Sequence, residues 1–287
     1  MPMNNRILRP LARPLLLDAV PGAAAAYSLR QLSNAYTGPV VTVRRSSDDA
    51  EADFKASEID DGTLAAFCGA GDGFVKTWHD QSGSGNDASQ GTAASQPKIV
   101  DSGSLVTEGG KATVDFDGTN DYLDIATVTV LGCEDATIPH SIACVFKCDQ
   151  TSGSTFISSN YNSVGLGTNV LGFEATKIVN LRAGAGSTNT ATAPQDTELH
   201  VGFHWYQGGV SAPRLFAGYR DGAILPTVPA DGVFTDSGSF ESNIALRLGR
   251  WGTLSIYFDG RIGEYILWPA DLLANRERIE GDIAWYY

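Results

Sequence analysis

The sequence is poor in the features that mark metal-binding, membrane and secreted proteins. It has only four cysteines in 287 residues, and none forms a CxxC pair or stands near a histidine at zinc spacing, which argues against a zinc site. Prolines and arginines break up the apolar residues of the basic N-terminus, apart from Leu15-Leu16-Leu17. A signal peptide needs a longer apolar core, and a membrane helix needs roughly 20 apolar residues. We therefore expect no membrane span and a protein that is made and folded in a cytoplasm.

Positive charge is also scarce. The chain has 20 Lys and Arg against 33 Asp and Glu, which gives a formal net charge of −13. This charge repels phosphate backbones, and no basic stripe with interleaved aromatic residues compensates for it. We therefore expect no nucleic-acid partner.

The few cysteines are Cys68, Cys133, Cys144 and Cys148. We expect buried free thiols, because free cysteine is a common core residue. Cys144 and Cys148 lie on one expected strand, too far apart to bond to each other. The alternative is that either of them pairs across strands, with Cys133 as its partner.

Glycine is abundant, with 32 residues, while 43% of the chain is apolar and 18% is charged. This composition predicts short strands between tight turns, and the length suits a single sandwich core. We place one all-β domain at residues 23–287, beginning with a short helix over 23–32. Residues 1–22 contain Pro10, Pro14 and Pro21, which prevent a continuous helix. They predict an extended arm that docks on another protein, or else a strap on its own domain.

The densest run of turn-forming residues spans 78–87 and reads Trp-His-Asp-Gln-Ser-Gly-Ser-Gly-Asn-Asp. It follows an expected strand over 73–78, so it is a tight loop whose side chains bond to their own backbone. Aromatic faces stack on sugars, and Asp, Asn and Gln bond to sugar hydroxyls. The candidate carbohydrate-binding residues are Trp78, His79, Asp80, Gln81, Asn86 and Trp251. The alternative is that Asp80 and Asn86 only fix the loop while Trp78 fills the core.

Together with two further segments, this loop resembles the catalytic module of arabinofuranosidase B. The segments are Arg-Arg-Ser-Ser-Asp-Asp at 44–49 and Asp-Phe-Asp-Gly-Thr-Asn-Asp-Tyr-Leu at 115–123, and the likeness covers residues 26–125. The resemblance implies a concanavalin-like two-sheet β-sandwich, or jelly roll. Similar modules also occur in the tail, fibre and capsid-associated proteins of bacteriophages.

Two carboxyl groups are needed by a retaining glycosidase, about 5 Å apart. The resemblance implies an acid/base aspartate shortly before the final strand, where this chain reads Gly249-Arg250-Trp251-Gly252 without a carboxylate. It implies a glutamate nucleophile near the middle of the module, where Glu174 is the candidate. Without a proton donor, assistance of roughly 100- to 10,000-fold is lost. We therefore expect no catalysis.

A second acidic run offers weak calcium candidates at Asp115, Asp117, Asn120 and Asp121, although their spacing fails the EF-hand pattern. No other cofactor is expected. The hypothesis that follows is a non-enzymatic bacteriophage or prophage virion protein, such as a fibre, decoration or tail component. Its arm would dock on other virion proteins, its loops would bind host-surface glycans, and it would form a homo-oligomer. The alternatives are an arabinofuranosidase-like glycoside hydrolase and an assembly protein without a ligand.

Overall fold

The computed structural model describes residues 13–127, 129–133, 138–150, 157–159, 168–174, 177–182, 188–192, 196–208, 214–228, 233–234, 245–251 and 255–287. At 159, 168–174, 177–182, 188–192, 214–216, 227–228 and 233–234 the description is limited to the backbone. Strands dominate these residues and the helices are short, which confirms the all-β prediction. Among the described residues, no helix has the length and apolar character needed to cross a bilayer.

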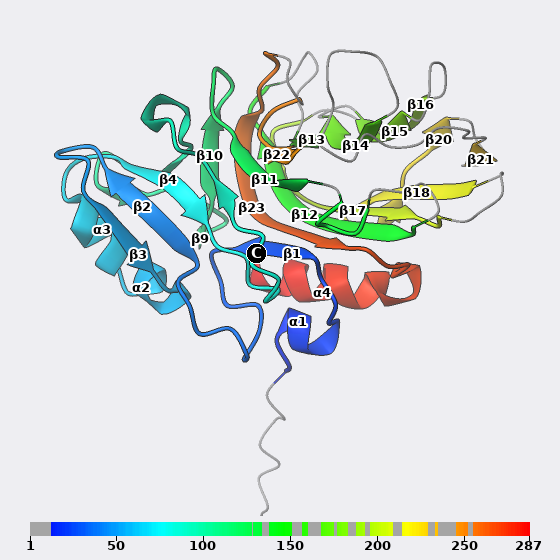
Figure 1. The fold of residues 1–287 in the computed structure, drawn as a ribbon, viewed down its shortest axis with the longest axis horizontal. Helices are drawn as coiled ribbons and strands as arrows, with labels where there is room; N and C mark the ends of the chain where they lie inside the picture. The colour runs from blue at the N-terminus through cyan, green and yellow to red at the C-terminus, as the bar shows by residue number, and fades with distance from the viewer. Residues whose placement is uncertain are drawn as a thin grey trace, which may run out of the picture.

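The last strand, β23 (Asp259–Trp268), organises the sheet. On one side it pairs antiparallel with β12 (His140–Cys148), which continues to β17 (Leu199–Tyr206) and β18 (Arg214–Arg220). On its other side it pairs with β1 (Ala25–Ser28) and then with β10 (Val114–Asp117). The last strand therefore joins strands from the first and middle parts of the chain (Figure 1).

The N-terminal half extends this sheet beyond β10. The order continues through β6 (Lys98–Asp101), β4 (Gly73–Trp78), β2 (Val41–Arg45) and β3 (Glu51–Phe54). A branch leaves β4 through β5 (Ala88–Ser89), β11 (Leu123–Thr127), β22 (Ala245–Leu248) and β13 (Ser158–Ser159). These pairings give one continuous 17-stranded sheet among the described residues. The division into the two sheets of a jelly roll stays a prediction.

Shorter elements complete the described chain. Two helices of the N-terminal half are α2 (Ala56–Asp60) and α3 (Thr63–Cys68). A separate sheet holds β14 (Thr168–Glu174), β15 (Lys177–Arg182), β16 (Thr188–Thr192) and β20 (Thr227–Val228). The rest are β7 (Ser104–Leu105), β8 (Thr107–Glu108), β9 (Lys111–Ala112), β19 (Ala223–Ile224), β21 (Val233–Phe234), and the 3-10 helices η1 (Ala93–Ser95) and η2 (Leu273–Asn275).

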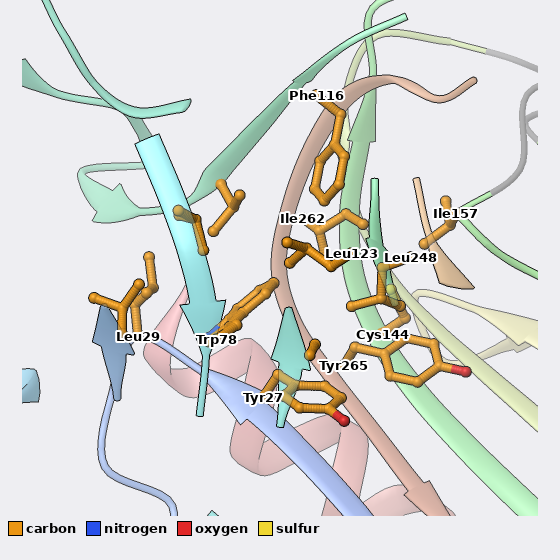
Figure 2. Packing of buried hydrophobic residues seen from close by; sticks show 14 of the residues in the cluster. Tyr27, Leu29, Trp78, Phe116, Leu123, Cys144, Ile157, Leu248, Ile262 and Tyr265 are labelled. Atoms are coloured by element: carbon orange, nitrogen blue, oxygen red, sulfur yellow. The ribbon is translucent and has the colours of Figure 1, made fainter. Parts of the chain in front are cut away.

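Two apolar clusters cover opposite faces of the central strands, because side chains alternate along a strand. In β12, Cys144 belongs to the first cluster and Val145 to the second. Figure 2 shows the first cluster, in which Trp78, Tyr27 and Tyr265 lie beside one another. The second cluster is covered by two helices, α1 (Leu16–Ala19) and α4 (Arg276–Tyr286). All four cysteines are buried free thiols, as expected.

The predicted helix over 23–32 is wrong. Residues 25–28 form β1, a strand with four buried side chains that pairs with Leu267 to Glu264 of β23. Pairing with a buried strand outweighs the helix propensity of alanine, which is a weak preference. Within the predicted arm, residues 13–22 include α1, whose Leu16 and Leu17 are buried in the second cluster. Residues 1–12 lie outside the described residues, so docking by the arm stays a prediction.

Candidate functional site

The Asp80 side chain sits inside the loop that follows β4. Its Oδ1 accepts hydrogen bonds from the backbone N–H groups of Ala26 and Ser82, both at 2.8 Å. Its Oδ2 accepts the Asn86 N–H at 3.0 Å and the Ser82 hydroxyl at 2.7 Å. Four donors therefore surround one carboxylate that is only 3% exposed. A buried charge with this many partners holds a structure together.

The other polar residues of the loop bind the N-terminal segment. Gln81 accepts the Leu32 N–H at 2.8 Å and donates from Nε2 to the carbonyl oxygens of Ser28 and Arg30, each at 2.9 Å. Asn86 donates from Nδ2 to the carbonyl oxygen of Ala24 at 2.7 Å. These bonds fasten β1 and its flanks to the end of β4.

The remaining carbohydrate-binding candidates are placed apart. Trp78 is fully buried against Tyr27, with ring centroids 6.0 Å apart. His79 is partly exposed and contacts Asp87, with Nδ1 3.1 Å from Oδ2, a bond that lowers the pKa of that carboxyl. Trp251 is half-buried and follows β22. Of the five candidates in the loop, only His79 has a side chain that a sugar could reach, since Trp78, Asp80, Gln81 and Asn86 are buried.

A cavity of about 510 Å³ lies on the outer face of the N-terminal strands. In β10, the side chains of Val114 and Phe116 are buried in the core, so Asp115 and Asp117 project from the opposite face. The lining residues come from β2, β4, β6, β10, η1 and the segments around them: Arg44, Phe74, Ala93, Ala94, Gln96, Lys98, Asp115, Asp117 and Asp121.

Asp121 is the most deeply buried carboxyl group of this cavity, at 6% exposed. Its Oδ2 accepts the backbone N–H of Asp117 at 3.2 Å. Within the described part of the chain, its Oδ1 has no hydrogen-bond partner. Burial raises the pKa of Asp121 to about 7, with further contributions from the negative charges of Asp117 and Asp115. This carboxyl group therefore keeps its proton to a much higher pH than an ordinary aspartate does.

The other two carboxyl groups have different surroundings. Asp117 is exposed, and its Oδ1 accepts the N–H groups of Thr119 at 2.8 Å and Asn120 at 3.1 Å. Asp115 is half-buried, with Oδ1 3.3 Å from Nε of Arg261. Burial raises the pKa of Asp115, and Arg261 opposes that shift.

Two cations complete the cavity. The Arg44 guanidinium lies 4.8 Å from the centre of the Phe74 ring, and its Nε donates to Oε1 of Gln96 at 2.8 Å. Lys98 lies 3.3 Å from Asp72 and 3.1 Å from Asp101. The cavity thus offers charged donors and carboxylate acceptors beside an apolar wall, a combination that suits a small polar ligand.

Three of the calcium candidates, Asp115, Asp117 and Asp121, line this cavity, and the fourth, Asn120, donates its backbone N–H to Asp117, but the four do not form a metal site. Among the described residues, no group of three or more His, Cys, Asp or Glu side chains is placed to hold a metal ion. The Asp117 carboxylate is engaged with backbone N–H groups of its own turn, and the Asp115 carboxylate is paired with Arg261.

The segment 249–252, where the resemblance implies an acid/base aspartate that this chain lacks, begins at Gly249, which lies next to Asp121. Gly249 has a φ of +81°, and a Cβ there would lie 2.3 Å from Cδ1 of Phe116 and 3.0 Å from the carbonyl oxygen of Asp121. Only glycine fits this contact. Arg250 lies over the ring of Tyr122 at 5.0 Å. Glu174 ends β14, where only the backbone is described. Sequence spacing did not indicate that Asp121 and Gly249 meet.

Comparisons with known proteins point to carbohydrate enzymes. Residues 17–136 match the family model described as the catalytic domain of alpha-L-arabinofuranosidase B. A comparison with curated proteins finds no match. An arabinofuranosidase complexed with arabinofuranosyl-alpha-1,2-xylobiose is similar in structure, with a TM-score of 0.58 at 15% identity. A mutant GH54 α-L-arabinofuranosidase soaked with 4-nitrophenyl α-L-arabinofuranoside gives a TM-score of 0.60 at 15% identity. Each likeness covers 93% of this chain and 64% of the other, so this chain spans less than two thirds of their length.

These findings correct the hypothesis from the sequence. The fold is similar to that of a class of glycoside hydrolases, and the model that residues 17–136 match describes a catalytic domain. The prediction of a non-enzymatic bacteriophage virion protein is therefore wrong, and the stated alternative, an arabinofuranosidase-like glycoside hydrolase, is favoured. The absence of a carboxylate at 249–252 does not exclude catalysis, because segments distant in the sequence bring other carboxyl groups close to Gly249.

Proposed function

We propose that this protein is a glycoside hydrolase that cleaves α-L-arabinofuranosides in the cavity lined by Asp115, Asp117 and Asp121. One observation carries the proposal: every residue that lines the cavity lies inside the segment, 17–136, that matches the catalytic-domain model. The similar solved structures support the substrate class, because one is a complex with an arabinofuranosyl ligand and another was soaked with an arabinofuranoside.

The chemistry of the cavity suits this reaction. Hydrolysis of a glycosidic bond uses two carboxyl groups, one that protonates the leaving oxygen and one that assists at the anomeric carbon. The cavity holds a buried carboxyl group at Asp121 and an exposed carboxylate at Asp117. Lys98, with 29% of its side chain exposed, can donate to sugar hydroxyls. The half-buried Phe74 ring supplies an apolar wall.

The test is the release of 4-nitrophenol from 4-nitrophenyl α-L-arabinofuranoside by the purified chain. We expect turnover that exceeds the rate on 4-nitrophenyl β-D-xylopyranoside. A double variant, Asp117→Asn with Asp121→Asn, should lose at least about 100-fold of this activity. The exposed Asp124→Asn serves as the matched control and should retain it. No release by the unaltered chain, or equal release by the double variant, would overturn the proposal.

A further inference from the structure

A second cavity, of about 400 Å³, lies between the C-terminal helix α4 and the turn that joins β18 to β19. It shares no lining residue with the cavity around Asp121. The turn consists of Asp221 and Gly222, with φ values of +51° and +79°. These values suit a two-residue turn between twisted strands, so the hairpin fixes one wall of the cavity. The other wall is α4, which packs against β17 (Figure 1).

Glu280 is the buried carboxyl group of this second cavity, at 7% exposed. Its Oε2 is paired with Nη1 of Arg276, one helical turn earlier. Its Oε1 is also buried, and it has no hydrogen-bond partner among the described residues. A buried oxygen without a donor costs free energy. A ligand that brings a donor to this oxygen would therefore be stabilised.

Arg276 supplies donors beside this acceptor. Its guanidinium carbon lies 4.2 Å from the centre of the Tyr219 ring, and its Nη1 donates to the carbonyl oxygen of Gly222 at 3.2 Å. Burial raises the pKa of Glu280, although Arg276 opposes the shift, and a carboxyl group that keeps its proton can donate as well as accept. The cavity thus suits hydroxyl groups, which donate and accept. An ammonium ion only donates, and the positive charge of Arg276 repels it.

An exposed tryptophan lies at the edge of the same cavity. Trp285 is 76% exposed and follows Gly281, a lining residue, by four positions on α4. Residues four apart share one face of a helix, and a helical side chain leans over the preceding turn. A Cβ at Gly281 would meet no side chain of the described residues within 4 Å, so the surface there is open. The Arg13 guanidinium lies 5.9 Å from the centre of the indole ring and leaves most of it exposed.

We propose that this second cavity and the Trp285 ring form a binding site for a neutral oligosaccharide of pyranose rings. The apolar face of a pyranose ring would stack on the indole, while its hydroxyl groups bond to Glu280 and Arg276. The inference goes beyond the proposed function, because the site lies outside the cavity around Asp121 and its occupation requires no cleavage.

The experiment titrates the purified chain with xylotriose, cellotriose and maltotriose, which contain no arabinofuranoside. In the ¹H–¹⁵N spectrum, the indole N–H signal of Trp285 is the one that Trp285→Phe removes. This signal should shift with at least one of the three sugars, with a Kd of about 1 mM. By calorimetry, Trp285→Ala should weaken that binding by at least about tenfold, whereas Trp285→Phe, which keeps a flat ring, should weaken it by less than about threefold.

Glu280→Ala should weaken binding as well, in protein whose urea denaturation shows that it is folded. The matched control is Val130→Ala, which removes a different exposed apolar side chain and should leave binding unchanged. The double variant Asp117→Asn with Asp121→Asn should also bind the sugar as the unaltered chain does. Binding of none of the three sugars, equal binding by Trp285→Ala, or loss of binding in the double variant would overturn the inference. None of these results changes the test of arabinofuranoside cleavage, so the two proposals fail separately.

Discussion

The Asp80 loop and the Asp121 cavity each bury a carboxyl group, but they supply it with very different numbers of hydrogen bonds. Both place an aspartate almost fully inside the protein, at 3% and 6% exposed. Asp80 receives four hydrogen bonds from three backbone N–H groups and a hydroxyl. Asp121 receives one, at 3.2 Å. The desolvation of a buried carboxylate is compensated in the first case and left largely uncompensated in the second.

This contrast in hydrogen bonding separates the buried aspartate with a structural role from the one that is available for chemistry. The Asp80 carboxylate has used its acceptor capacity on the chain itself, so nothing remains for a ligand. Asp121 keeps a free acceptor and a raised pKa in a cavity, which is the pattern expected of a proton donor. The most conspicuous sequence motif, the loop over 78–87 that contains Asp80, therefore stabilises the fold.

The largest effect should come from removing the compensated carboxylate. Asp80→Ala leaves the buried N–H groups of Ala26, Ser82 and Asn86 without their acceptor. We expect a loss of about 3–5 kcal/mol in the free energy of unfolding. Urea denaturation followed by tryptophan fluorescence measures it. A loss below about 1 kcal/mol would mean that water or a neighbour replaces the carboxylate, and the contrast with Asp121 would fail.

Removing the uncompensated carboxylate should have the opposite sign. The folded chain binds the proton of Asp121 more tightly than the unfolded chain does, because the pKa rises from 3.8 to about 7 on folding. Stability should therefore fall as the pH rises from about 4 to 7 and stay level above that range. Asp121→Asn carries no charge, so at pH 8 it should be more stable than the unaltered chain by about 2–4 kcal/mol. At pH 4 the two should be equal.

Urea denaturation at pH 4, 6 and 8 measures this difference. An Asp121→Asn variant that is less stable than the unaltered chain at pH 8 would show that the carboxylate is as well satisfied as that of Asp80.

A smaller effect should follow from changing the neighbour. Asp117→Asn removes one of the negative charges that raise the pKa of Asp121, while the amide oxygen of Asn still accepts the N–H of Thr119. The pKa of Asp121 should fall, and the variant should gain about 0.5–1 kcal/mol in stability at pH 8. The midpoint of the fall in stability with pH should move to lower pH. An unchanged midpoint would show that burial alone raises the pKa of Asp121.

Part of this comparison could be predicted from the sequence. Alternation in the segment 114–117 is enough to place Asp115 and Asp117 on the face opposite the core, and turn chemistry is enough to predict that Asp80 fixes its loop. The burial of Asp121 could not be predicted, because it depends on the packing of distant loops. The Tyr122 N–H donates to the carbonyl oxygen of Ser95 at 3.2 Å, and Gln90 donates to that of Tyr122 at 3.2 Å. These contacts close the cavity over a residue that reads as part of an exposed turn.

The fold shows the same division between local and distant causes. The strands β2, β4, β12 and β23 follow from runs of alternating or β-branched residues, which are local signals. The strand β1 does not, because its alanine-rich segment becomes extended only by pairing with β23, more than 200 positions away. The sequence indicates that Asp80 and Gln81 belong to a tight loop. It does not indicate that their hydrogen-bond partners are the backbone N–H groups of Ala26 and Leu32, which hold β1 in place.

The smallest effect should come from an aspartate close to Asp121 that is exposed. Asp124 lies on β11 with 43% of its side chain exposed, and its Oδ1 is 2.7 Å from Nε of Arg247. An ion pair open to solvent contributes little, so Asp124→Asn should change the free energy of unfolding by less than about 1 kcal/mol, by a similar amount at pH 6 and pH 8. Urea denaturation at both values measures it. A change as large as that of Asp121→Asn would mean that proximity to the cavity, and not burial, sets the energetics of these carboxyl groups.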